Sequence, residues 1–253
     1  MIRAYNGNCL EVMDDLIAQG VRVDAVICDP PYGTISCGWD SVIPFPEMWE
    51  RLDKITKPTA AVVLFGSEPF STLLRASNIK DYKYDWYWVK NKVTGFVQCK
   101  NKPMKNIELI SVFSKGTTGH VGKSKNRMTY NPQDLIEVNK TKKNGKGKFG
   151  TIAREWSGMQ DTYTQEFTNY PKMVINFKSD TDLVHPTQKP AALLEYLVKT
   201  YTNPGETVLD FTDGSRTTGV ACYNTGRDYI GIELDEGYYK AGNARIEALE
   251  SNI

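Results

Sequence analysis

The feature that most constrains the fold is a short, largely apolar run that ends abruptly at two prolines. Residues Val23–Cys28 read VDAVIC, and Asp29, Pro30, Pro31 and Tyr32 follow at once. A run of this kind is typical of a strand that is buried on both faces, as in a parallel sheet. Because proline fixes φ and lacks a backbone N–H, the strand is expected to end there.

The same order of strand and helix recurs along the chain. Residues 60–65 form an apolar run that precedes a turn and a helix containing Leu73 and Leu74. Two more strands, each followed by a helix, are predicted at 206–211 with 217–224 and at 229–234 with 237–250. This alternation predicts an α/β fold with a doubly wound, mostly parallel sheet, whose ligands bind beyond the carboxyl ends of the strands. Asp29 and the loop that begins near Thr212 both follow such ends, so we expect them to meet.

Charge is distributed unevenly, although the net charge is only +1. Residues 115–154 contain ten Lys or Arg and two acidic residues, whereas residues 206–250 contain nine acidic and four basic residues. A polyanion would be attracted to this basic middle. Residues 139–150, rich in Lys and Gly, show no helical or strand period and predict a loop, either a solvated linker or a DNA contact. Flanking aromatic residues favour DNA, with Lys140, Lys142, Lys143, Lys146, Lys148 and Arg154 as candidates.

Other features exclude several classes of protein. The five cysteines are scattered without a C-x-x-C pair, and there are two histidines, so neither a disulfide framework nor a metal site is expected. No apolar run reaches the roughly 18 residues of a membrane span. The first residues lack the apolar core of a signal peptide, which predicts a cytoplasmic location.

Residues 29–32 combine groups that suit an exocyclic base amine. Such an amine is a poor nucleophile because its lone pair is delocalised into the ring. A site can help by accepting hydrogen bonds from both N–H groups, which turns the lone pair toward a methyl donor. The Asp29 carboxylate and the Pro30 carbonyl are suitable acceptors, and Tyr32 can stack on a base flipped from the duplex. Taken alone, these four residues could also form a structural turn, an alternative that the preceding apolar strand makes less favoured.

A second motif, DFTDGSRTTG at residues 210–219, lies between a predicted strand and helix. Such a loop of small residues lets a ligand approach the N–H groups at the start of a helix. Glu233 ends the next strand, 19 residues after Gly214, where an acid can bind ribose hydroxyls. A dinucleotide fingerprint would require glycine instead of Arg216 to admit a pyrophosphate. A nucleoside without phosphates is therefore the better expectation than a nicotinamide dinucleotide.

A third motif, VHPTQKP at residues 184–190, immediately precedes a predicted helix with Leu193, Leu194 and Leu197. Two prolines bracket a polar segment that contains His185. By itself this pattern would describe a residue that only hydrogen-bonds at the entry to a helix.

Together and in this order, the three motifs resemble the DNA amino-methyltransferases of the permuted β group. The resemblance covers almost the whole chain apart from about 115–175. It implies S-adenosylmethionine as methyl donor, duplex DNA as substrate, and a homodimer as a plausible assembly. It also implies that Asp29, Pro30, Pro31 and Tyr32 hold the target base. Around the cofactor it places His185, Thr187, Lys189, Asp210, Phe211, Thr212, Gly214, Ser215, Glu233 and Leu234.

The residue before Pro-Pro-Tyr bears on the acceptor. In the amino-methyltransferases that this chain resembles, Asp is commoner at this position in adenine-N6 enzymes and Ser is usual in cytosine-N4 enzymes. Enzymes that methylate protein glutamine generally carry Asn there. Asp29 therefore favours adenine N6, with cytosine N4 as the alternative. The sequence contains no Pro-Cys motif of the kind that would indicate attack at cytosine C5.

The cofactor loop departs from the family pattern at Asp213 and Arg216, where a neutral residue and a second glycine are usual. If residue 216 has a positive φ, arginine costs on the order of 1 kcal/mol there, and its side chain could fill cofactor space. Three interpretations stay open: a tolerated variant with an Asp213–Arg216 ion pair, weak cofactor affinity, or a relative impaired in catalysis that still binds DNA or cofactor.

The sequence thus predicts a site-specific adenine-N6 DNA methyltransferase of a bacterial or phage-infected cell, as in restriction–modification. Residues 1–114 are expected to form the catalytic half, 115–175 the target-recognition region, and 176–253 the cofactor-binding half of the domain. Methyl transfer to a flipped-out base needs no metal and no covalent enzyme intermediate. The target sequence and any partner restriction enzyme cannot be read from the residues.

Overall fold

The computed structural model describes residues 1–33, 41–119, 126–143, 162–180 and 188–251. These residues divide into two compact units. The larger unit comprises Met1–Asn131 and Met173–Ile253, and the smaller unit comprises Pro132–Lys172. The predicted site residues that the structure describes lie in the larger unit, except for the basic residues of the middle segment.

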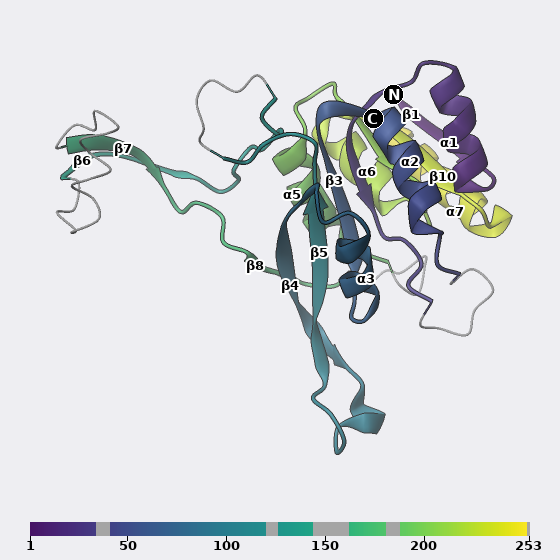
Figure 1. Ribbon diagram of the computed structural model, residues 1–253, viewed down its shortest axis with the longest axis horizontal. Helices are drawn as coiled ribbons and strands as arrows, with labels where there is room; N and C mark the ends of the chain where they lie inside the picture. Colours follow the sequence, from purple (N-terminus) through teal and green to yellow (C-terminus); the bar gives the residue numbers. More distant parts are fainter. Residues whose placement is uncertain (34–40, 120–125, 144–161, 181–187, 252–253) are drawn as a thin grey trace. The chain divides into compact units, whose positions relative to one another are not determined.

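The larger unit is built on an eight-stranded sheet in the order β1-β10-β9-β2-β3-β5-β4-β8 (Figure 1). All neighbours pair in parallel except β5, which is antiparallel to both β3 and β4. The predicted α/β class with a mostly parallel sheet is confirmed. The strands are β1 (Ile2–Asn6), β2 (Val23–Cys28), β3 (Thr56–Gly66), β4 (Tyr82–Thr94), β5 (Lys105–Phe113), β8 (Val174–Phe177), β9 (Thr207–Asp210) and β10 (Asp228–Glu233).

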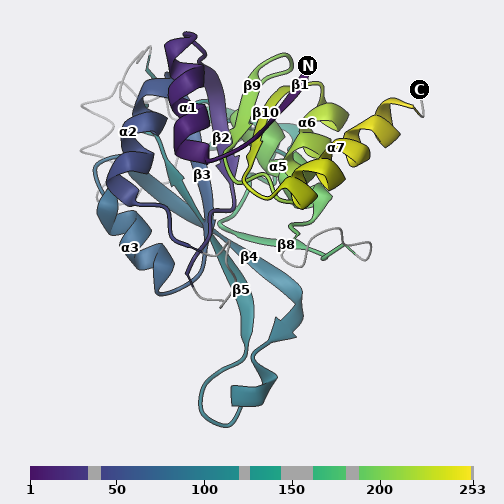
Figure 2. The ribbon, with the colours of Figure 1, turned by 90° about the vertical axis from the view of Figure 1, so that its right-hand side faces the viewer.

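Helices cover both faces of this sheet (Figure 2). On one face lie α1 (Cys9–Ala18), α2 (Phe45–Ile55) and α3 (Phe70–Ser77); on the other lie α5 (Ala191–Tyr201) and α6 (Thr217–Thr225), with α7 (Glu236–Glu250) beside α6 and β1. A 3-10 turn, η1 (Phe96–Gln98), joins β4 to β5. Within the described part of the chain, no helix is long and apolar enough to cross a membrane.

The alternation of side chains along β2 explains the two layers. Ala25 and Ile27 pack in the hydrophobic cluster that includes the buried face of α5. Val26 and Cys28 point to the opposite face and pack with residues of α1 and α2. Successive side chains of a strand point to opposite faces, so a strand covered on both sides needs apolar residues at nearly every position. This requirement accounts for the apolar run that first indicated the fold.

The order of the strands creates a crevice between β9 and β2. From β9 the chain continues through α6 to β10 on one side, and from β2 it continues through α2 to β3 on the other. Two adjacent parallel strands whose connections run in opposite directions form a topological switch point, where doubly wound sheets bind ligands. Asp29 follows β2 and Asp210 ends β9, so both predicted motifs lie at this crevice.

The smaller unit corrects one expectation. Its antiparallel strands β6 (Ile136–Lys143) and β7 (Thr162–Thr168) include residues 139–143, which were predicted to lie in a loop. The prediction failed because this ribbon is exposed on both faces, which leaves no apolar alternation to detect. Lys140, Lys142 and Lys143 are exposed on β6. Lys146, Lys148 and Arg154 lie outside the described residues.

Residues at the start of the predicted target-recognition region pack with the larger unit. Met128 is 4% exposed within the hydrophobic core, and the Thr129 N–H donates to the Thr59 carbonyl at 3.0 Å. The smaller unit begins only at residue 132. Its role in target recognition stays a prediction.

Two adjacent leucines of α3 test the assignment of the buried faces. Leu74 is fully buried and Leu73 is 59% exposed. We expect Leu74→Ala to lower the free energy of unfolding by about 2–5 kcal/mol, because it opens a cavity in the core. Leu73→Ala should change it by less than about 0.5 kcal/mol. Urea unfolding of both variants measures the difference, and equal effects would contradict this packing.

Candidate active site

One cavity of about 660 Å³ opens at the carboxyl ends of the sheet and brings the predicted motifs together. A cavity of this volume is in the range of small-ligand sites. All four predicted catalytic residues line it: Asp29, Pro30, Pro31 and Tyr32. Eight of the ten predicted cofactor residues line it as well: Lys189, Asp210, Phe211, Thr212, Gly214, Ser215, Glu233 and Leu234. His185 and Thr187 lie outside the described residues.

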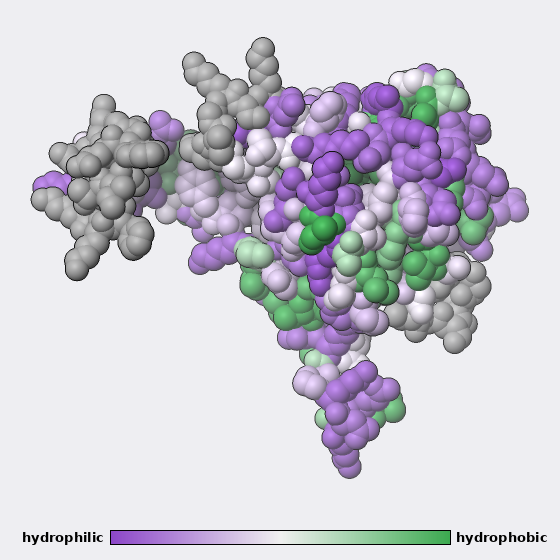
Figure 3. Space-filling view, viewed as in Figure 1, coloured by the Kyte–Doolittle hydropathy of each residue, from purple (hydrophilic) through white to green (hydrophobic). Residues whose placement is uncertain are grey.

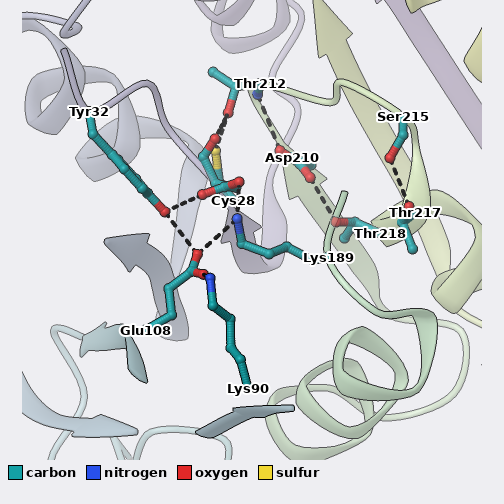
Figure 4. A network of polar contacts seen from close by, with 11 residues as sticks. Cys28, Tyr32, Lys90, Glu108, Lys189, Asp210, Thr212, Ser215, Thr217 and Thr218 are labelled. Carbon is teal, nitrogen blue, oxygen red and sulfur yellow. Dashed lines mark hydrogen bonds and ion pairs between the residues drawn. The ribbon is translucent and has the colours of Figure 1, made fainter. Parts of the chain in front are cut away.

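Lys189 links two carboxylates at the catalytic end of the cavity (Figure 4). Its ammonium donates to Asp29 Oδ2 and forms an ion pair of 2.9 Å with Glu108 Oε1. Glu108, on β5, also pairs with Lys90 of β4 at 3.0 Å. The Tyr32 hydroxyl donates to Asp29 Oδ1 and lies 3.3 Å from Glu108 Oε1. These contacts connect the loop after β2, the start of α5 and the β4–β5 pair.

The charges of this network shift its pKa values. Burial raises the pKa of the Asp29 carboxyl, with Glu108 acting in the same direction and Lys189 against it. Burial would also raise the pKa of Glu108, but Lys189 and Lys90 outweigh it and lower that pKa to about 2. The two carboxylates outweigh the effect of burial on Lys189 and raise its pKa. At neutral pH Glu108 is therefore ionised and Lys189 is protonated.

Further contacts fix the backbone and the ring of the motif. The Thr212 hydroxyl donates to the main-chain carbonyl of Asp29 at 3.0 Å, which ties the catalytic motif to the loop after β9. The Tyr32 ring packs on Phe70 of α3, with ring centroids 5.0 Å apart. The Asp29 side chain keeps 24% of its surface exposed, so it remains accessible from the cavity.

The loop after β9 is held by two acids. Glu233 Oε2 accepts the Gly214 N–H at 2.6 Å, and Glu233 Oε1 accepts the Asp235 N–H at 2.8 Å. Asp210 accepts the Thr218 hydroxyl at 2.7 Å and the Thr212 N–H at 3.2 Å. Burial, together with the nearby charge of Asp213, raises the pKa of Asp210 to about 7. The carboxyl of Glu233 also has a raised pKa, caused mainly by burial.

Arg216 has a positive φ of 56° and points away from the cavity. Its side chain is 1% exposed and extends between α6 and α7, where its guanidinium lies 5.4 Å from the Tyr239 ring centre. Arg216 Nε donates to Asp213 Oδ2 at 2.6 Å, and Nη1 donates to Asn243 Oδ1. Asp213 also accepts the Tyr229 hydroxyl at 2.5 Å. The ion pair, rather than occupation of the cofactor space, is the interpretation that the geometry supports.

Two glycines make room for this buried pair. A Cβ at Gly231 would lie 2.4 Å from Asp213 Oδ2, and a Cβ at Gly219 would lie 2.7 Å from Arg216 Cγ. Heavy atoms cannot approach so closely without rearrangement. The departure from the family pattern at residues 213 and 216 is therefore accommodated by residues on the next strand and helix.

Sequence reasoning missed several residues of the cavity. The loop after β1, which includes Gly7 and Asn8, and Phe65 at the end of β3 line it. Lys189 Nζ lies 5.1 Å from the centre of the Phe65 ring. The position of the β1 loop at a strand end was the only signal for it. Among the described residues there is no cluster of His, Cys, Asp and Glu that could hold a metal ion.

Comparison with known proteins agrees with this geometry. A family model described as DNA methylase (N6/N4 methylases) matches residues 23–244. The Type II methyltransferase M1.MboII of Moraxella bovis is 26% identical over 268 residues, covering 99% of this chain and 98% of that protein.

Solved structures are similar over nearly the whole length. The complex of M1.HpyAVI with SAM superimposes with a TM-score of 0.63 at 27% identity, covering 97% of this chain and 100% of that one. The cytosine-N4-specific PvuII DNA methyltransferase has a TM-score of 0.65 at 15% identity, covering 96% of this chain and 86% of that one, which is a likeness of fold. With its motifs at one cavity and a family model spanning most of its length, this chain belongs to the N6/N4 family of DNA methylases.

Proposed function

We propose that this protein is a site-specific DNA methyltransferase that transfers the methyl group of S-adenosylmethionine to adenine N6. The observation that carries the proposal is the shared cavity: the Asp29 motif and the loop held by Glu233 line one space of about 660 Å³. The sulfonium of S-adenosylmethionine supplies an electrophilic methyl group when the cofactor is bound. The cofactor in the solved complex of M1.HpyAVI is the same compound.

The charges of the cavity fit a cationic nucleoside. Its end beside β9 and β10 is lined by Asp210 and Glu233, and by Asp213, whose charge is paired with Arg216; no Lys or Arg among the described residues lines that end. A pyrophosphate would be repelled there, whereas a sulfonium and an amino group would be attracted. Glu233 ends β10 and would hold the ribose hydroxyls, and the backbone at Gly214 would border the methionine part.

The remaining groups act on the acceptor nitrogen. Asp29 and the Pro30 carbonyl would each accept one N–H of the base amine, which orients its lone pair toward the methyl donor. Each carboxylate oxygen has two lone pairs, so Asp29 can accept a base N–H while it keeps Lys189 and Tyr32 as donors. An ionised Asp29 can also take the proton that the nitrogen loses after transfer.

Lys189 would serve as a positioning residue. It contributes a positive charge that opposes protonation of Asp29, and its second contact with Glu108 holds the ammonium in place. Glu108 in turn is kept ionised by Lys189 and Lys90. The network thereby supports an acceptor that is negatively charged and fixed in direction.

Adenine is proposed over cytosine because Asp29 precedes Pro-Pro-Tyr. Cytosine N4 is the alternative acceptor, because a cytosine-N4 enzyme has a similar fold. A relative impaired in catalysis is disfavoured, because Arg216 is turned into the space between α6 and α7 and does not line the cavity. A duplex DNA substrate, a cytoplasmic location and a homodimer belong to the same proposal.

The first test uses cells that express the chain. We expect sequencing of the methylome to report N6-methyladenine at one recognition sequence, and mass spectrometry of nucleosides to identify the same base. N4-methylcytosine would establish the alternative acceptor. DNA without either base would overturn the proposed function.

Asp29→Ala tests the acceptor group. Loss of the carboxylate is expected to lower the rate of transfer by about 10²- to 10³-fold, since one preorganised hydrogen-bond partner of the reacting nitrogen is removed. Affinity for S-adenosylmethionine in calorimetric titration should stay within about threefold, because Glu233 and the glycine loop are untouched. Asp14→Ala, at an exposed acid on α1, is the matched control. Normal transfer by Asp29→Ala would refute the assignment.

The pH dependence of transfer tests the network. Because ionised Asp29 is required and its pKa is raised, kcat/KM should fall on the acid side at a pH above the ordinary aspartate value of about 3.9. Glu108→Gln removes a charge that raises the pKa of Asp29, so the acid limb should move to lower pH. Lys189→Met removes a charge that lowers it, so the limb should move to higher pH. Shifts in the same direction would contradict this network.

Arg216→Gly tests the interpretation of the altered cofactor loop. Removing one partner of a buried ion pair costs about 3–5 kcal/mol, and relief of the positive φ returns about 1 kcal/mol. We therefore expect a net loss of about 2–4 kcal/mol in the free energy of unfolding, measured in urea. The double variant Asp213→Ser, Arg216→Gly should recover part of that loss. A large gain in cofactor affinity from Arg216→Gly would instead support the interpretation that Arg216 weakens cofactor binding and impairs catalysis.

A further inference from the structure

The Thr212 hydroxyl lies between the loop after β9 and the strand end that carries Asp29. Hydrophilic side chains cover much of the face shown in Figure 3, where water competes for their hydrogen bonds. Thr212 is instead half-buried and lines the cavity. Its hydroxyl donates to the Asp29 main-chain carbonyl at 3.0 Å and lies 2.9 Å from Cys28 Sγ (Figure 4).

The proton of this hydroxyl is committed to the carbonyl. A threonine hydroxyl carries one proton, and the Asp29 carbonyl accepts it. Burial, followed by the charge of Asp210, raises the pKa of the Cys28 thiol, so the thiol stays protonated at neutral pH. A neutral sulfur is a weak acceptor and does not compete with the carbonyl. The hydroxyl of Thr212 therefore acts on the backbone of Asp29 rather than on a ligand.

The carbonyl of Asp29 belongs to the peptide unit that joins Asp29 to Pro30. A peptide unit is planar, so a hydrogen bond to its oxygen restrains the orientation of the whole unit. Proline has no backbone N–H, so this unit can form hydrogen bonds only through its oxygen. The bond from Thr212 therefore restrains the Asp29–Pro30 unit from the side of the cofactor loop.

The two prolines transmit this restraint to the next carbonyl. The ring of Pro30 fixes its φ, and Pro31 confines the ψ of Pro30 to extended values. Both torsions between the restrained peptide unit and the Pro30 carbonyl are therefore limited by covalent structure. As a result, the direction of the Pro30 carbonyl follows the orientation of the Asp29–Pro30 unit.

We infer that Thr212 is a positioning residue that sets the direction of both proposed acceptors of the base amine. The restrained unit adjoins the Cα of Asp29 on one side and leads to the Pro30 carbonyl on the other. Lys189 and Tyr32 hold the Asp29 carboxylate, and Thr212 holds the backbone from which it extends. This inference rests on the proposed function.

Thr212→Val tests the inference because it removes the hydroxyl and keeps the shape of the side chain. At saturating S-adenosylmethionine, we expect methyl transfer to unmethylated plasmid DNA to slow about 10- to 100-fold, since the acceptors lose their alignment. Affinity for S-adenosylmethionine in calorimetric titration should stay within about threefold, because the bond between Glu233 and Gly214 is untouched. Thr212→Ser restores the hydroxyl and should recover the rate to within about threefold.

Thr200→Val is the matched control. Thr200 is 1% exposed on α5, and its hydroxyl donates to the Tyr196 carbonyl at 2.7 Å. It does not line the cavity, so this variant loses the same kind of bond and should transfer methyl groups at the wild-type rate. Thermal unfolding of both valine variants verifies that each is folded. Thr212→Ala repeats the comparison without a branched side chain.

A double-mutant cycle tests the route through the proline. Pro30→Ala keeps the carbonyl but frees φ, so the restraint is no longer transmitted. In this background Thr212→Val should reduce the rate by a factor at least about fivefold smaller than in the wild-type chain. Equal factors in the two backgrounds would show that Thr212 does not act through the direction of the Pro30 carbonyl, and would overturn the inference.

The outcomes separate this inference from the proposed function. If the wild-type chain methylates DNA and Thr212→Val does so at the same rate, the inference is overturned and the function stands. The same holds if Thr212→Val loses only affinity for S-adenosylmethionine, because Thr212 would then support the cofactor loop alone. Failure of Thr212→Ser to recover the rate also overturns the inference. If the wild-type chain methylates no DNA, both fail.

Discussion

The bridge that Lys189 makes between Asp29 and Glu108 is the interaction on which the site depends. Asp29 follows β2, Glu108 lies on β5, and Lys189 precedes α5, so three separate parts of the larger unit meet at one ammonium. A carboxylate buried without such a partner would become protonated. Protonated Asp29 would accept hydrogen bonds poorly, and the proposed chemistry requires an acceptor at that atom. The ion pairs therefore link the packing of the sheet to the reactivity of the motif.

A second buried ion pair explains how the chain tolerates its unusual cofactor loop. Asp213 and Arg216 compensate each other, and Gly231 and Gly219 provide the volume that they occupy. Either substitution alone would leave an unpaired buried charge, which is among the most destabilising changes known. The two residues are best regarded as one structural substitution, in which Asp213 still lines the cavity and Arg216 does not.

Much of the fold and of the candidate site could be predicted. The apolar run Val23–Cys28 indicated a strand buried on both faces, and the order of the motifs indicated which strand ends would meet. The prediction of secondary structure failed where a strand forms only through pairing with another part of the chain. Residues 139–143 of strand β6 carry no apolar side chain and form a strand through pairing with β7, so the sequence pattern predicts a loop there.

The sequence by itself determined the α/β class, the family and the motifs that meet at the cavity, because these depend on local patterns and on the order of motifs along the chain. Only the tertiary structure decided the electrostatics. Lys189 lies 160 positions from Asp29, and no spacing reveals that their side chains form an ion pair. The direction of the Arg216 side chain could not be read from the sequence either. It is set by the positive φ of residue 216 and by the space that Gly219 and Gly242 leave, which together turn the side chain away from the cavity. Side-chain direction depends on backbone conformation and neighbouring volume, and both are properties of the folded molecule.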